Sequence, residues 1–208
     1  MAIISSLILE LRTDLSDDDS TRWTDAKILN LFKKAIRRAN RVVQRNGLQF
    51  AKKKVSIKTI ADQAFVVLST VAPDFDVWIG LWRDDIHQQI KLRTEHEWEE
   101  EQCASALGYC MLDYANDKIL FDSTPSTAQD ITLWYYPKID PSTYTVSSAT
   151  PWDGRLDDII MEYVGLRLKN IDEMDIGVDR ELLIDMENQI LSAYLPNSPY
   201  HVQGDGWL

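Results

Sequence analysis

Histidine and cysteine are scarce in this chain, which leaves little material for metal or redox chemistry. The 208 residues include three histidines and two cysteines. Cys103 and Cys110 lie seven residues apart, without CxxC spacing, as is typical of reduced thiols in a protein made in the cytoplasm. His96 stands in the run HEWEEE, but the second histidine of an HExxH arrangement is missing. The sequence therefore predicts no metal site and no cofactor.

Long apolar runs and the common catalytic motifs are also missing. No apolar stretch approaches the roughly 20 residues that span a bilayer, so we expect no membrane association. The N-terminal run MAIISSLILEL has no basic start and includes Glu10, which favours a first helix over a secretion signal. GxSxG, a glycine-rich phosphate loop and a Walker lysine are absent. Acidic pairs such as Asp157 and Asp158 are expected on an exposed helix side, so the sequence predicts no enzyme.

The net charge is −11, and its distribution along the chain is uneven. Residues 20–58 contain twelve Lys or Arg and a single acid, Asp25, whereas the rest of the chain contains ten Lys or Arg and thirty-two acids. Residues 153–187 alone contain eleven acids and four cations. This asymmetry predicts an electrostatic partnership, either between parts of one chain or between copies.

Apolar residues spaced three and four apart predict helices near both ends of the chain. A short helix is expected over 3–13 and a long one over 24–46, with Thr24 as its N-cap and Asn46-Gly47 as its end. Two further helices are expected within 156–195, the first capped by Asp153. Basic side chains line the polar sides of the long helix. Those that we expect to bind a partner are Arg37, Arg38, Arg41 and Arg45.

The middle of the chain changes to strand-like patterning, which suggests a division into segments. We expect an α+β protein, mainly α, in which the terminal helices pack as a bundle around an inserted antiparallel β subdomain. The segments are helices at 1–49, the β subdomain at 50–137, a linker at 138–155, helices at 156–195 and an extended C-terminal arm at 196–208.

The strand predicted over 131–136 is apolar or aromatic on both faces. Alternation places Ile131, Leu133 and Tyr135 on one side, and Thr132, Trp134 and Tyr136 on the other. Either the strand lies at the centre of the chain's own sandwich, or one of its faces contacts a neighbouring chain. In the second case either Trp134 and Tyr136 or Ile131 and Tyr135 are the interface residues. We name Trp134 and Tyr136 as the candidates, because Trp and Tyr are enriched at interfaces.

Two stretches of the chain carry a resemblance to a known family. From Trp23 the chain reads W-T-D-A-x-I-L-x-x-x-x-x-A-I-x-x-A-N, after a short helix and a charged loop. Further on, Leu120-Phe121, a loop containing Pro125 and the run ITLWYYP at 131–137 precede a Ser/Thr-rich linker with Pro151-Trp152. This order resembles the head-to-tail connector proteins of tailed bacteriophages, also called adaptors, over nearly the whole chain.

The resemblance implies a structural virion protein at the head–tail interface, made in the host cytoplasm. It implies a homomeric ring of about twelve copies between the portal protein and a downstream tail protein, with double-stranded DNA passing through without specific binding. A C-terminal arm used in docking would bind the portal or a neighbouring subunit through Tyr200, Trp207 and Leu208. The alternatives are a tail-tube or nozzle component, a non-virion DNA-associated packaging factor that uses helix 24–46, and a carboxylate-dependent hydrolase of cell-wall glycan.

Overall fold

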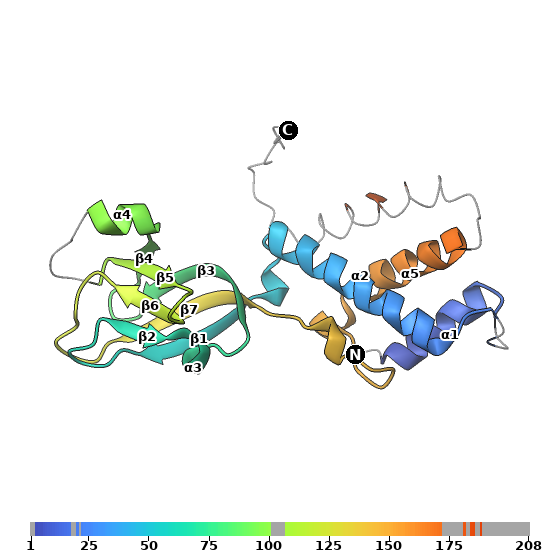
Figure 1. Ribbon diagram of the computed structural model, residues 1–208, viewed down its shortest axis with the longest axis horizontal. Coiled ribbons are helices and arrows are strands. Elements are labelled where there is room, and N and C mark those ends of the chain that lie inside the picture. Colours follow the sequence, from blue (N-terminus) through green and yellow to red (C-terminus); the bar gives the residue numbers. More distant parts are fainter. Residues whose placement is uncertain are drawn as a thin grey trace. The chain divides into compact units, whose positions relative to one another are not determined.

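The structure, a computed structural model, divides the chain into two compact units (Figure 1). Unit 1 combines the two ends of the chain, Met1–Phe50 and Ile139–Leu208, and unit 2 is Ala51–Lys138. Residues 3–17, 20, 22–100 and 107–171 are described, together with residues 181, 184, 185 and 188.

Three helices of unit 1 pack together: α1 (Ile4–Asp14), α2 (Asp25–Arg45) and α5 (Asp157–Ile171). The predicted ends of the long helix are confirmed. The Thr24 hydroxyl accepts a hydrogen bond from the Lys27 amide at 3.3 Å, and Gly47 follows the helix with a φ of 69°. One apolar stripe of α2 is buried, formed by Ile28, Leu31, Phe32, Ala35, Ile36, Ala39 and Val43.

A buried arginine joins the end of α1 to the start of α2. The Arg12 side chain is 4% exposed and donates to the Asp17 carboxylate, to the Trp23 carbonyl at 2.7 Å and to the Asp25 carboxylate at 2.6 Å. The Asp17 side chain is fully buried and also accepts from the Arg22 amide at 2.9 Å. A buried charge must be paired to be tolerated, so this cluster joins Asp17, Trp23 and Asp25 to the end of α1.

The segment before α5 is hydrogen-bonded to the first helix. It contains two short 3₁₀ helices, η2 (Pro141–Thr143) and η3 (Pro151–Gly154). The Ile4 amide donates to the Ser148 carbonyl at 3.0 Å, and the Ser5 amide donates to the Val146 carbonyl at 2.8 Å. Asp153 has a φ of 56° within η3, and α5 begins four residues later. The prediction that Asp153 caps this helix is therefore wrong.

Unit 2 is built on one seven-stranded sheet in the order β1-β7-β3-β4-β5-β6-β2. Two short helices, α3 (Leu68–Val71) and α4 (Glu95–Glu100), accompany it, and the 3₁₀ helix η1 (Gln49–Ala51) precedes it. The strands are β1 (Lys53–Lys58), β2 (Phe65–Val67), β3 (Phe75–Arg83), β4 (Gln88–Leu92), β5 (Tyr109–Asp113), β6 (Lys118–Phe121) and β7 (Asp130–Pro137).

The sheet corrects the predicted fold class in two respects. First, the sheet is mixed, because β4 and β5 run parallel while every other pair is antiparallel. Parallel neighbours need a crossover connection, and α4 lies in the segment that joins these two strands. Second, the described chain is not a mainly α bundle, because the mixed sheet forms a complete unit with its own core. Periodicity identified strands but gave no information on how they pair.

Strand β7 lies between β1 and β3, and its core face is now identified. Ile131, Leu133 and Tyr135 belong to the hydrophobic core of unit 2, and the first two are fully buried. This core also takes Ile57 from β1 and Leu81 from β3. The opposite face carries Thr132, Trp134 and Tyr136, so the aromatic side chains of that face need a separate explanation.

The hydroxyl group of the core residue Tyr135 makes a polar contact. The Tyr135 hydroxyl donates to the Asp74 carboxylate at 2.7 Å, and the Lys53 ammonium lies 2.5 Å from the same carboxylate. Burial and the neighbouring Asp74 carboxylate raise the pKa of Tyr135 from its ordinary 10.0 to about 12. The hydroxyl is therefore held in its neutral, donating form.

This contact predicts a dependence of stability on alkaline pH. Because the pKa of Tyr135 is raised in the folded state, its contribution is fully present below pH 10.0 and is lost as the pH rises from 10.0 to about 12. Tyr135→Phe is expected to cost about 1 kcal/mol at neutral pH, the net value of one hydrogen bond. Urea denaturation at a series of pH values measures the difference in the free energy of unfolding between this variant and the wild type. That difference should become smaller above pH 10.0. A constant difference across that range would contradict it.

Candidate binding surfaces

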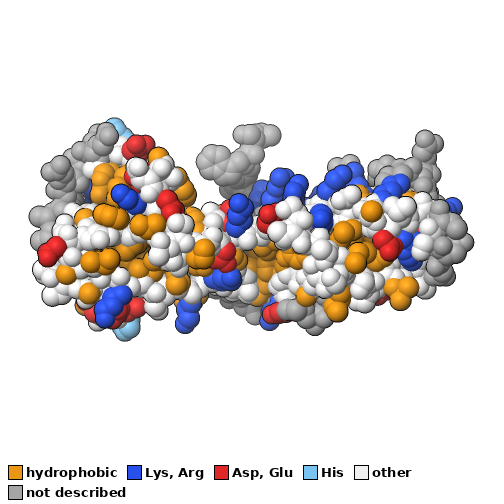
Figure 2. All heavy atoms as spheres, turned by 60° about the horizontal axis from the view of Figure 1, so that its bottom comes forward, with side chains coloured by type: hydrophobic (Ala, Val, Ile, Leu, Met, Phe, Trp, Pro, Cys, Tyr) orange, Lys and Arg blue, Asp and Glu red, His pale blue; other side chains and the backbone are white. Residues whose placement is uncertain are grey.

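The first candidate surface is the basic face of α2. Arg37, Arg38, Arg41 and Arg45 are all exposed, at positions outside the buried stripe of the helix. Figure 2 shows Lys and Arg side chains following one another along one side of the helical unit. The Arg38 guanidinium lies 5.4 Å from the ring centre of Tyr163 on α5, within the range of a cation–π contact.

We expected the basic face of α2 to contact acidic side chains of the C-terminal helices or of another chain. Among the described residues, Arg37, Arg41 and Arg45 make no ion pair. Asp157 at the start of α5 is only 8% exposed, contrary to the expectation for the Asp157–Asp158 pair, while Asp158 is exposed. Burial raises the pKa of Asp157, because the surroundings disfavour the charged carboxylate. The first turn of α5 thus contributes only one exposed carboxylate of the pair.

The C-terminal candidates cannot be placed. Tyr200, Trp207 and Leu208 lie outside the described residues, as does the whole arm at 196–208. Most of the second C-terminal helix expected within 156–195 also lies outside them, and the acids Glu181 and Asp185, which are described, are exposed. The proposed docking role of the arm therefore stays a prediction.

The two aromatic candidates of β7 have different environments. Tyr136 is 4% exposed, and burial raises the pKa of its hydroxyl. Trp134 is half-buried, so part of its indole ring remains open to solvent. Of the two, Trp134 is the one whose side chain a partner can reach.

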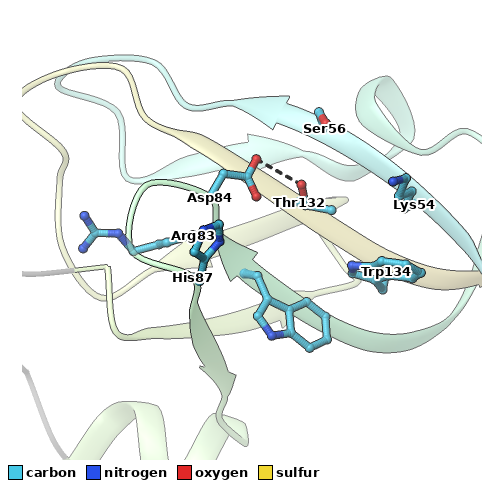
Figure 3. Close-up of a pocket in the computed structure, with 8 residues that line it drawn as sticks. Lys54, Ser56, Arg83, Asp84, His87, Thr132 and Trp134 are labelled. Carbon is cyan, nitrogen blue, oxygen red and sulfur yellow. Dashed lines mark hydrogen bonds between the residues drawn. The ribbon is translucent and has the colours of Figure 1, made fainter.

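Trp134 lines a pocket on the outer face of the sheet (Figure 3). The volume of the pocket is about 290 Å³. Cross-strand pairing of β7 with β1 and β3 brings most of the pocket's side chains together. Trp134 pairs with Lys54 and Gly80. Thr132 pairs with Ser56 and Trp82. The end of β3 and the turn after it supply the remaining side chains. The lining residues are Lys54, Ser56, Trp82, Arg83, Asp84, His87, Thr132 and Trp134.

The indole rings of Trp82 and Trp134 form a corner in this pocket. Their centres are 6.4 Å apart and their planes meet at 79°, a favourable edge-to-face arrangement. Trp82 lies over Gly80, where a Cβ atom would overlap its ring. Glycine inside a strand often marks such a close approach. The Lys54 ammonium lies 5.9 Å from the ring centre of Trp134. The aromatic corner is therefore held by its neighbours on both sides.

The charged groups of the pocket are nearly balanced. Asp84 accepts a hydrogen bond from the Thr132 hydroxyl at 3.0 Å (Figure 3). Arg83 is directed to Asp85, to which it donates at 3.1 and 2.6 Å, so its charge is already compensated. Lys54 and Asp84 then contribute one charge of each sign. The pocket thus offers an aromatic corner with hydrogen-bonding groups around it.

Sequence patterning identified Trp134 as a candidate and missed the rest of this pocket. The pocket depends on the register of β1 and β3 against β7, which alternation along one strand does not determine. One usable signal was Gly80 within the run VWIGLW, because a glycine between large residues of a strand indicates that something lies over it.

Metal and thiol chemistry find no support in the described part of the chain. Among those residues, no group of three or more His, Cys, Asp or Glu side chains could hold a metal ion. Burial raises the pKa of the Cys110 thiol to about 12, which leaves it unreactive, while Cys103 lies outside the described residues. Within the described ranges, no helix is both long enough and apolar enough to cross a membrane.

Comparison with known proteins assigns no family. No family model matches the chain, and no curated protein sequence matches it.

Proposed function

We propose that this chain is a non-enzymatic structural protein of a tailed-bacteriophage virion. Within that class it acts as a head-to-tail connector, a homomeric ring between the portal protein and the tail. The stretch from Trp23 and the run at 131–137, which resemble connector proteins, give the proposal this particular form. Double-stranded DNA would pass through the ring without specific binding.

The observation that carries the proposal is the exposed arginine face of α2. The helix buries its apolar stripe within its own unit, while Arg37, Arg41 and Arg45 remain exposed and make no ion pair with a described residue. Outside residues 20–58 the chain carries a charge of −22. The basic face of one copy is therefore complementary to the acidic surface of another. Contacts between two different patches are head-to-tail contacts, and these form a ring where the rotation from one copy to the next closes.

The test of this proposal reverses charge on the helix. Arg37→Glu combined with Arg41→Glu is expected to weaken assembly on the portal by roughly tenfold or more, since close charge pairs couple by about 1.5 kcal/mol or more. Wild-type assembly should also weaken as salt is raised. Arg37→Lys with Arg41→Lys keeps the charge and is the matched control. Assembly is measured by native mass spectrometry of each variant mixed with the portal protein from the same genome.

The same arginines also favour a second candidate, a DNA-associated packaging factor. Exposed cations along a helix can contact phosphates without reading sequence. The net charge of −11 argues against this role, because most of the molecular surface would repel the duplex. A mobility-shift assay at low salt separates the two. Tight binding of duplex DNA by the wild type, lost in the Glu variant, would contradict the connector assignment of this helix.

A further inference from the structure

The pocket between Trp82 and Trp134 plays no part in the evidence for the connector function. We propose that it is a carbohydrate-binding site that receives one neutral sugar ring of a glycan. The inference does not depend on the connector assignment, because it rests only on side chains of unit 2. The volume of about 290 Å³ is at the small end of ligand pockets, which fits a single ring better than an extended ligand.

The aromatic corner supplies the apolar part of such a site. The face of an indole ring carries negative potential, which attracts the weakly positive C–H groups on one side of a sugar ring. Trp82 lies over Gly80, and Trp134 contacts both the Trp82 ring and the Lys54 ammonium. Both indoles are half-buried, so each is fixed in place and still partly open. A ring fixed in advance loses little entropy when a ligand stacks on it.

The rim supplies hydrogen-bonding groups of both kinds. Asp84 is an acceptor with lone pairs beyond the one that Thr132 uses, and a carboxylate makes the stronger, charge-assisted bonds to hydroxyl groups. Lys54 is a donor, Ser56 is both donor and acceptor, and both are exposed. His87 extends from the turn after β3 with a φ of 51° (Figure 3). Each sugar hydroxyl can both donate and accept a hydrogen bond, which matches this mixed set.

The charge balance excludes a polyanion as the preferred ligand. Nucleic acids and phosphate groups are held by clustered, uncompensated cations. Here Asp85 compensates Arg83, and Asp84 lies in the same pocket as Lys54. A phosphate at this position would meet the Asp84 carboxylate. The pocket is therefore better matched to a neutral ligand than to single-stranded nucleic acid, although stacking alone would suit both.

The position in the sheet argues against a peptide ligand. The two indoles of the pocket stand on β7 and β3, which are inner strands whose backbone groups already pair on both sides, while Lys54 and Ser56 stand on the edge strand β1. A peptide lying over the two indoles cannot add as a further strand, so its main chain would find few partners there. Recognition must then come from side chains arranged around a small, open pocket, which can receive one ring of a sugar.

The experiment titrates the full-length protein with maltohexaose, cellohexaose and chitohexaose by isothermal titration calorimetry, alongside an array of neutral bacterial glycans. Saturable binding of at least one neutral glycan is expected. Trp82→Ala and Trp134→Ala should each weaken it by roughly tenfold or more, because each removes an aromatic anchor. Asp84→Asn keeps the shape of the pocket and should also weaken binding, while circular dichroism confirms that the variant is folded.

The control is Tyr114→Ala, an aromatic residue of the same unit that is 68% exposed and lies outside the pocket. It should bind as the wild type does. Absence of binding to every neutral glycan by the folded wild type would overturn the proposal. Glycan binding that survives both tryptophan substitutions would overturn it as well, as would Trp-dependent binding of oligo(dT) or of peptides in place of sugars. None of these outcomes depends on whether the chain assembles on a portal.

Discussion

Arg12→Met is expected to lower the free energy of unfolding of the helical unit by about 3–5 kcal/mol. Methionine keeps an unbranched apolar stem, but it leaves the fully buried Asp17 carboxylate without its cationic partner. It also removes the donors to the Trp23 carbonyl and to Asp25, which hold the start of α2 against the end of α1. Urea denaturation followed by the helical circular dichroism signal measures the loss.

Two companion variants show whether the buried charge causes the loss. Asp25→Asn should cost below about 1 kcal/mol, because the Asp25 side chain is 67% exposed and its pair is screened by solvent. Arg12→Met combined with Asp17→Asn removes both charges and should recover much of the stability. If the double variant were no more stable than Arg12→Met alone, packing of the arginine rather than charge pairing would explain the effect.

Neighbouring positions of β7 are expected to respond very differently to truncation. Leu133→Ala should cost about 2–5 kcal/mol in unit 2, because Leu133 is fully buried in the core and its loss leaves a cavity. Trp134→Ala, on the opposite face, should cost about 1–2 kcal/mol, since a half-buried side chain loses less buried area. Tyr136→Ala should resemble Leu133→Ala, because Tyr136 is also buried.

Binding measurements on these three variants further distinguish the two faces of β7. Trp134→Ala should fold and yet lose a binding property, either assembly with a neighbour or binding of a glycan. Thermal unfolding of the monomer gives the stabilities, and native mass spectrometry gives the assembly. Equal loss of monomer stability at positions 133 and 134 would instead indicate that both faces of the strand serve only the chain's own packing.

Local patterns in the sequence predicted individual elements well. Thr24 and Gly47 mark the two ends of α2. The start of a helix needs a side chain that can accept from a free amide, and its end often needs a residue that tolerates a positive φ. The alternation of β7 likewise gave two faces, of which one is the core. These features depend on neighbours within one turn or one strand, and such neighbours are visible in the sequence.

Long-range pairing could not be predicted in the same way. Strands β1 and β2 are consecutive in the chain, yet β1 pairs with β7 and β2 pairs with β6. Their pairing depends on contacts between residues far apart in sequence, and alternation is equally compatible with many partners. The pocket of Lys54, Asp84 and the two tryptophans depends on that pairing. Asp157 was misplaced for a related reason, because its burial comes from tertiary packing and not from the spacing within its helix.

The central claim is that copies of this chain assemble on a portal through the arginine face of α2. Negative-stain electron microscopy of the purified chain mixed with the portal protein from the same genome tests it most directly. The account predicts a ring added to one end of the portal with wild-type protein and with the Arg37→Lys, Arg41→Lys control, and bare portals with the Arg37→Glu, Arg41→Glu variant. Bare portals with folded wild-type protein, together with tight binding of duplex DNA by the same preparation, would contradict it.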